Sequence, residues 1–128
     1  MGIRGVGASK EQAFEQAAMA LTAVITEPAN VEPKEKIEIA CEAADDEMLL
    51  VEWLSSLLFE MDSRKMLFGR FEVHIEQSAG GRLRGVCWGE KVDVEKHSPA
   101  VEVKGATYTL LSVKEDDGRW LAQCVVDV

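Results

Sequence analysis

A run of apolar residues between positions 45 and 61 constrains the fold of this chain more than any other feature. The apolar positions are Leu49, Leu50, Trp53, Leu54, Leu57, Leu58 and Met61. At about 3.6 residues per turn they cover one wide side of an α-helix, which is stable only when it packs against another layer. Asp45, Asp46 and Glu47 precede the run, and negative charge favours a helix N-terminus because of the helix dipole. We therefore predict a helix over residues 45–61 that lies on a β-sheet.

A second helix is predicted over residues 9–25. Ser9 with Gln12 three residues later is a capping-box pattern, and apolar residues then recur at helical spacing. The preceding residues 2–7 (GIRGVG) are typical of a short strand that ends in a tight turn. A glycine-rich segment before a helix can also bind phosphate, but this glycine spacing is not that of a dinucleotide-binding or P-loop motif. The pattern therefore favours the turn.

The rest of the chain is predicted to be β structure, with strands over residues 36–43, 66–78, 82–93, 100–115 and 119–128. Residues 36–43 alternate between apolar and charged, which is typical of a half-buried strand. A two-residue hairpin turn at Gly80-Gly81 would set these cross-strand pairs: Val73 with Trp88, and Ile75 with Val86. A second turn at Asp117-Gly118 would set these: Leu111 with Cys124, and Tyr108 with Asp127.

Together these elements predict one α+β domain over residues 1–128. Two helices are expected to pack on one face of a largely antiparallel β-sheet, in a two-layer sandwich. The helix residues expected in the core of this sandwich are Trp53, Leu54, Leu57 and Leu58.

The charge of the chain limits its direct partners. It has 23 acidic and 14 basic residues, a net charge of -9, and shows no basic stripe of the kind that holds nucleic acid. Its three cysteines, Cys41, Cys87 and Cys124, are widely spaced without a CxxC pair, which is typical of reduced cytosolic thiols. No apolar run approaches the roughly 20 residues that span a bilayer, and no signal peptide is visible. We expect a cytoplasmic protein that acts on another protein and binds neither membranes nor, strongly, nucleic acid.

Asp127 lies near the end of an apolar strand, next to the terminal carboxylate of Val128. Two carboxylates so close repel each other unless a cation or a basic group lies between them. Hard cations such as Ca²⁺ and Mg²⁺ prefer these oxygen ligands. The residues alone leave two interpretations open, a divalent metal site or an acidic chain end exposed to solvent.

Five polar residues are concentrated in one predicted loop and the strand after it: Glu90, Asp93, His97, Glu102 and Lys104. Polar loop residues often contact partners, so these are candidates for a partner surface. Alternatively, they form hydrogen bonds that hold the loop in place. Neither histidine of the chain has a familiar metal-ligand spacing, and no nucleophile with a nearby base is recognisable. We therefore expect no catalytic residues.

Four segments in order carry a resemblance to a known family: GIRGVG (2–7), LLVEWL (49–54), Gly89-Glu90 with Asp93, His97 and EVKGATY (102–108), and WLAQCVVDV (120–128). The third segment resembles the archease pattern G-E-x-x-D-x-x-x-H followed by E-V-K-A-x-T-Y. The fourth resembles the closing strand of the same family, which ends in Asp and one aliphatic residue. Gly105 and Thr109 depart from the family's usual Ala and His. The chain is thus similar to archeases over essentially its whole length.

The resemblance implies an accessory protein rather than an enzyme. Archeases support RtcB-class RNA ligases in tRNA splicing and RNA repair, where they promote ligase guanylylation and multiple turnover and bind a divalent metal. The family's metal ligands correspond to Asp127 and the main-chain carboxylate of Val128, and a third ligand, an Asp, would fall immediately before Met1. We expect the natural chain to begin upstream of Met1 and this chain to bind Ca²⁺, Mg²⁺ or Mn²⁺ weakly or not at all. The alternatives are a small metal-dependent hydrolase or nucleotide-binding enzyme that uses the acidic C-terminal site, and an α+β interaction domain of unassigned function.

Overall fold

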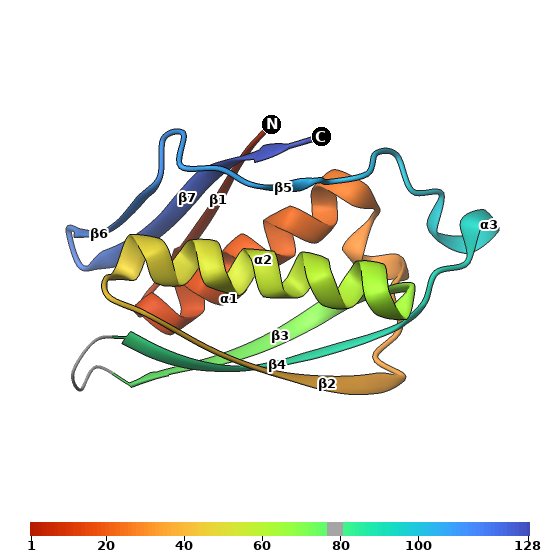
Figure 1. Cartoon of the computed structure of the whole chain (residues 1–128), viewed down its shortest axis with the longest axis horizontal. Helices are drawn as coiled ribbons and strands as arrows, with labels where there is room; N and C mark the ends of the chain where they lie inside the picture. Colours follow the sequence, from red (N-terminus) through yellow and green to blue (C-terminus); the bar gives the residue numbers. More distant parts are fainter. Residues whose placement is uncertain (77–80) are drawn as a thin grey trace.

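The computed structural model describes residues 1–76 and 81–128, in which two long helices lie between two antiparallel β-sheets (Figure 1). The elements in chain order are β1 (Gly2–Gly7), α1 (Lys10–Ile25), the 3-10 helix η1 (Pro28–Asn30), β2 (Glu35–Ala43), α2 (Asp46–Arg64), β3 (Met66–Glu76), β4 (Gly81–Lys91), α3 (Val94–His97), β5 (Gly105–Ala106), β6 (Ser112–Asp116) and β7 (Arg119–Asp127). One sheet has the order β1-β7-β5, with β6 also paired to β7, and the other has the order β2-β4-β3. The predicted α+β class with antiparallel pairing is confirmed. The strands form two sheets instead of the single sheet expected, so the helices are covered on both sides.

Helix α1 fits between the sheets because its small residues allow a close approach on one side. The Ser9 hydroxyl accepts a hydrogen bond from Gln12 N–H at 3.1 Å, and the Gln12 side chain accepts one from Ala8 N–H at 2.9 Å. This confirms the predicted helix start. The helix contacts β1 and β7 on one side and β3 on the other. A Cβ on Gly5 would overlap the carbonyl oxygen of Ala13, so glycine is required where β1 crosses the helix.

Helix α2 forms where the apolar pattern predicts it. It begins after Asp45, whose carboxylate accepts a hydrogen bond from Met48 N–H at 2.8 Å, and it ends at Arg64, three residues beyond the predicted end. Three of the expected core residues, Trp53, Leu54 and Leu57, are fully buried. The fourth, Leu58, is only half-buried. The helix contacts strands of both sheets.

Buried apolar side chains from both helices and both sheets form one continuous cluster. Cys87 and Cys124 are buried in it, Cys41 is half-buried, and all three are free thiols. In the described part of the chain, no helix combines the length and the apolarity that crossing a bilayer requires.

The predicted register between β3 and β4 is wrong. Gly80, half of the predicted turn, lies outside the described residues. The observed cross-strand pairs include Val73 with Gly85 and Ile75 with Leu83. This register differs from the prediction by three residues, and an odd shift exchanges the two faces of a strand. Leu83, Gly85 and Cys87 of β4 are on its buried face, where the Trp53 ring fills the space above Gly85, so the buried Val73 lies opposite this face and not opposite Trp88.

The C-terminal hairpin has the predicted turn. Asp117 and Gly118 both adopt positive φ, 52° and 78°, as a two-residue type I′ turn requires. The register that this turn sets is also the predicted one in the paired part: Ser112 with Gln123, Val113 with Ala122, and Asp116 with Arg119.

The predicted strand over residues 100–115 is not continuous. Strand β6 begins only at Ser112, so Leu111 lies outside the ladder and its predicted pair with Cys124 is not part of it. Residues 107–111 leave the strand path, and Leu110 adopts a positive φ of 53°. This excursion shifts the register of β5, so that Gly105 rather than Tyr108 pairs with Asp127.

Candidate functional site

Three segments of the chain meet at the end of β7. Val126 N–H donates a hydrogen bond to the Met1 carbonyl at 2.8 Å, and Lys104 N–H donates one to the Asp127 carbonyl at 2.7 Å. The two chain ends therefore lie side by side (Figure 1). Asp127 and Lys104 are exposed, and Val128 is 46% exposed. The sequence placed Asp127 and Lys104 in separate sets of candidates, and the fold brings them together.

The acidic groups at this end supply only part of a metal site. Asp127 and the terminal carboxylate of Val128 are hard oxygen donors, which Ca²⁺ and Mg²⁺ prefer. Within residues 1–76 and 81–128, no three His, Cys, Asp or Glu side chains come together in a way that could hold an ion. Two carboxylates fall short of the about six to eight oxygen ligands that Ca²⁺ takes. The described residues therefore do not form a complete metal site.

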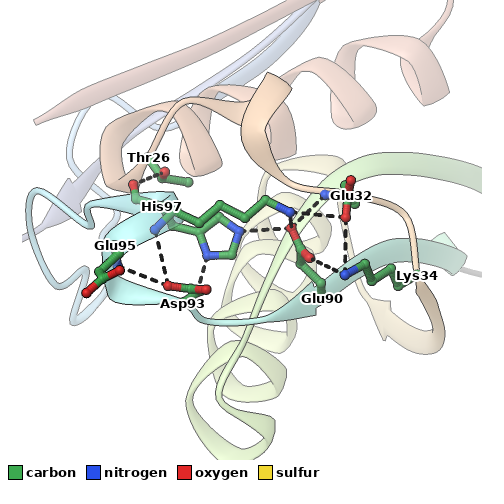
Figure 2. Close-up of polar contacts among 8 residues, drawn as sticks. Thr26, Glu32, Lys34, Glu90, Asp93, Glu95 and His97 are labelled. Carbon is green, nitrogen blue, oxygen red and sulfur yellow. Dashed lines mark hydrogen bonds and ion pairs between the residues drawn. The ribbon is translucent and has the colours of Figure 1, made fainter.

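Glu90, at the end of β4, is the centre of a second polar cluster (Figure 2). Its exposed fraction is only 5%. Its carboxylate accepts hydrogen bonds from Glu32 N–H at 2.9 Å and from His97 Nε2 at 3.0 Å. The ammonium groups of Lys96 and Lys34 lie 2.8 Å and 3.4 Å from its two oxygens. Donors and cations around a carboxylate stabilise its charged form. The Glu32 N–H, followed by the Lys96 ammonium, holds the pKa of Glu90 well below its usual range.

The hydrogen bonds of the His97 ring indicate its tautomer. The side chain is buried, and its Nδ1 accepts a hydrogen bond from Asp93 N–H at 2.9 Å. Because Nδ1 accepts, the ring proton lies on Nε2, which donates to Glu90. The His97 carbonyl accepts a hydrogen bond from the buried hydroxyl of Thr26, directly after α1. The His97 imidazole therefore links α3 to the end of β4, and the His97 carbonyl links α3 to the end of α1.

Burial removes Glu90 and His97 from the predicted partner surface. Their hydrogen bonds hold the segment after β4, which is the alternative that the sequence left open. Asp93 also has a structural role, because its carboxylate caps α3 by accepting from the N–H groups of Glu95 and Lys96, at 3.0 Å and 3.2 Å. Two of the five candidates have exposed side chains that form no hydrogen bond or ion pair with the rest of the described chain: Glu102 and Lys104.

Sequence reasoning missed three members of the Glu90 cluster: Glu32, Lys34 and Lys96. Glu32 and Lys34 lie in the irregular segment before β2, and Lys96 lies in a helix of one turn, so no periodic pattern marks them. Glu32 is 58 residues from Glu90 in the sequence. Only the folded chain brings these groups together.

The fold defines a class of small α+β proteins in which two helices separate two antiparallel sheets. The Archease protein family (MTH1598/TM1083) matches residues 1–128. Protein archease of Pyrococcus furiosus is 45% identical over 130 residues, which cover 100% of this chain and 92% of the relative. Protein archease of Sulfurisphaera tokodaii is 39% identical over 128 residues, which cover 100% of this chain and 91% of the relative.

Solved structures agree with these matches. The solution structure of Methanobacterium thermoautotrophicum protein 1598 has a TM-score of 0.87 at 33% identity and covers 99% of this chain and 91% of that one. The crystal structure of a Thermotoga maritima archease, described as a possible chaperone, has a TM-score of 0.64 at 16% identity. It covers 100% of this chain and 90% of that one, and at this identity it shows likeness of fold alone. The chain belongs to the Archease family.

Proposed function

We propose that this chain is an accessory protein of an RtcB-class RNA ligase. It promotes guanylylation of the ligase and multiple turnover in tRNA splicing and RNA repair, without catalysing a reaction itself. The observation that carries this proposal is the family match over the whole chain. The three free thiols fit a reducing cytoplasmic compartment. The net charge of -9 favours contact with the ligase over contact with RNA phosphates.

The ligase contact in this proposal is the end of β7. Asp127, the terminal carboxylate of Val128 and Lys104 are exposed there, on segments joined by backbone hydrogen bonds. Functional groups held on paired strands keep a more defined geometry than groups on a free loop. The end of β7 therefore presents negatively and positively charged groups to a partner in a preorganised arrangement.

A divalent metal is part of the same proposal. Asp127 and the Val128 carboxylate would hold a hard cation, Ca²⁺, Mg²⁺ or Mn²⁺, which would neutralise two neighbouring negative charges. In the β1–β7 register Gly2 pairs with Val125, so a residue preceding Met1 would lie opposite Asp127. With the described residues alone, we expect weak binding.

Reconstitution with the host's own ligase tests the proposal. We expect Asp127→Ala to abolish stimulation of RNA joining without changing the melting temperature, because the side chain is exposed. The matched control is Asp116→Ala, an exposed carboxylate at the other end of the β6–β7 hairpin. Normal stimulation by Asp127→Ala would remove this residue from the site. Turnover of nucleotides or phosphoesters by the chain alone would favour the hydrolase alternative.

Lys104 is tested separately from the acidic groups. We expect Lys104→Glu to weaken ligase stimulation far more than it lowers the melting temperature, because the side chain is exposed while its N–H carries the structural hydrogen bond. Lys114→Glu, at an exposed position of β6, is the control. A loss of stability that accounts for the whole loss of stimulation would show that Lys104 is structural.

A further inference from the structure

Two strands have edges that are closed by carboxylates from the helices. On β3, Val73 N–H donates to Glu15 at 2.8 Å and Ile75 N–H donates to Glu11 at 3.0 Å. On β6, Val113 N–H donates to Glu47 at 3.1 Å. An unpaired strand edge is a template for another strand, and these side chains satisfy the groups that such a strand would bind.

The free edge of β2 lacks this protection. The strand has nine residues, and among the described residues it pairs only with β4 (Figure 1). In the described part of the chain, the one side-chain hydrogen bond to its backbone is from Cys87 of β4 to the Ile37 carbonyl. The three-stranded sheet is thus closed at the β3 edge and open at the β2 edge.

The residues of β2 are self-complementary in one antiparallel register. Directly opposite residues in an antiparallel pair point to the same face. A twofold axis perpendicular to the sheet must therefore pass midway between one residue and its own copy on the other strand, and Ile39 is the midpoint of the nine residues. That register gives these pairs: Glu35 with Ala43, Lys36 with Glu42, Ile37 with Cys41, and Glu38 with Ala40. Opposite charges meet twice and like charges never oppose each other.

The neighbouring registers are unfavourable. A register centred on Glu38 places this glutamate opposite its own copy, and a register centred on Ala40 places Glu38 opposite Glu42. Like charges directly across a strand pair are destabilising. The charge pattern therefore favours the register centred on Ile39, which is also the register in which all nine residues of β2 are paired.

An exposed aromatic side chain lies beside the middle of the open edge. Phe59 of α2 is 67% exposed. With Ser55, Ser56 and Glu60 it borders a hollow of about 320 Å³ whose other wall is residues 38–40 of β2. A strand added at the β2 edge would cover this hollow and bury part of the Phe59 ring, which favours association by removing apolar surface from water.

We propose that two copies of this chain form a symmetric dimer by antiparallel pairing of β2 with β2, centred on Ile39. The pairing joins the two three-stranded sheets into one continuous sheet, with the α2 helices of both copies on the same face. This inference does not rest on the proposed function, because no residue of the β7 end takes part.

Reciprocal charge reversal tests the register. We expect the wild-type chain to sediment at twice its mass of 14.1 kDa as concentration rises. Lys36→Glu and Glu42→Lys should each raise the dimer Kd about tenfold, since each replaces two attractive cross-strand pairs with two repulsive ones. The double variant Lys36→Glu/Glu42→Lys restores the pairs in swapped order and should return the Kd to near the wild-type value. The controls are Lys114→Glu and Glu72→Lys, both at exposed strand positions outside β2.

Three results would overturn the proposal. They are a mass of 14.1 kDa at every concentration, single reversals that act no more strongly than the controls, and a double variant that does not recover. Hydrogen exchange of the β2 amides gives a second measurement. Protection that rises with the concentration of the chain alone supports self-pairing, whereas protection that appears only when another protein is added assigns the edge to that partner. Ligase stimulation is measured separately, so failure of the dimer leaves the proposed function untouched.

Discussion

Replacing Gly85 with alanine should destabilise the protein because of one contact. A Cβ at this position would overlap the Trp53 ring. The ring cannot move away easily, because its Nε1 donates to the Phe14 carbonyl at 3.1 Å and it forms a T-shaped pair with Phe71, with 6.3 Å between the ring centroids. Gly85 does not have a positive φ, so alanine can adopt its backbone conformation. Any loss of stability in Gly85→Ala therefore reports the contact with the Trp53 ring.

The magnitude follows from two effects. Overpacking a dense core typically costs about 1–3 kcal/mol, and weakening the buried Trp53 hydrogen bond adds about 1 kcal/mol. We expect Gly85→Ala to lower the free energy of unfolding by about 2–4 kcal/mol in urea titrations. For a chain of this size that is a fall in Tm on the order of 10 °C. Gly105→Ala is the matched control and should be close to neutral, because a Cβ there would meet no described atom within 4 Å beyond its chain neighbours.

A double-mutant cycle decides whether Trp53 is the cause. Trp53→Phe removes the ring atoms that a Cβ at position 85 would meet, so Gly85→Ala should cost less in that background. We expect the two substitutions to be non-additive by at least about 1 kcal/mol. Additive effects, or a neutral Gly85→Ala, would show that the Trp53 ring does not set the cost of a side chain at position 85.

Three further outcomes follow from buried side chains. Leu54→Ala should lower the free energy of unfolding by about 2–5 kcal/mol in denaturant titrations, because Leu54 is fully buried, and a loss below about 1 kcal/mol would contradict a core position. Glu90→Gln should be most destabilising at neutral pH, and the difference from wild type should shrink as pH falls below the usual glutamate pKa of about 4.3. The pKa of Glu90 is lower in the folded protein than in the unfolded chain, so the ionised carboxylate stabilises the fold above the unfolded-state pKa, and this stabilisation is lost in acid. A difference between variant and wild type that does not change with pH would contradict this role. Burial raises the pKa of Cys87 to about 12, so a thiol reagent at about pH 8 should react with it only after denaturation.

The sequence was sufficient where local chemistry decides the structure. The apolar spacing in α2, the Ser9 cap of α1 and the alternation in β2 each depend on residues within a few positions of one another. The Asp117-Gly118 turn belongs to the same group, because two adjacent residues with positive φ set the register of β6 with β7.

The candidate site was predicted only in part. The pattern at the chain end singled out Asp127, which is exposed at the end of β7, but it gave no sign that Lys104 lies on the adjoining segment. Glu90 and His97 were identified as important polar residues, yet their burial could not be read from the sequence. Glu90 is contacted by Glu32, which is 58 residues away in the sequence, and by Lys96 of α3.

By itself the sequence determined the helices, most strands, one hairpin and the family resemblance, because each of these is encoded in short-range patterns of polarity and backbone preference. The tertiary structure alone decided that the strands divide into two sheets, that Val73 pairs with Gly85, and that Glu90 is enclosed. These features depend on contacts between residues far apart in the chain. The Trp53 ring fills the space above Gly85, and this contact forms only when α2 packs on β4.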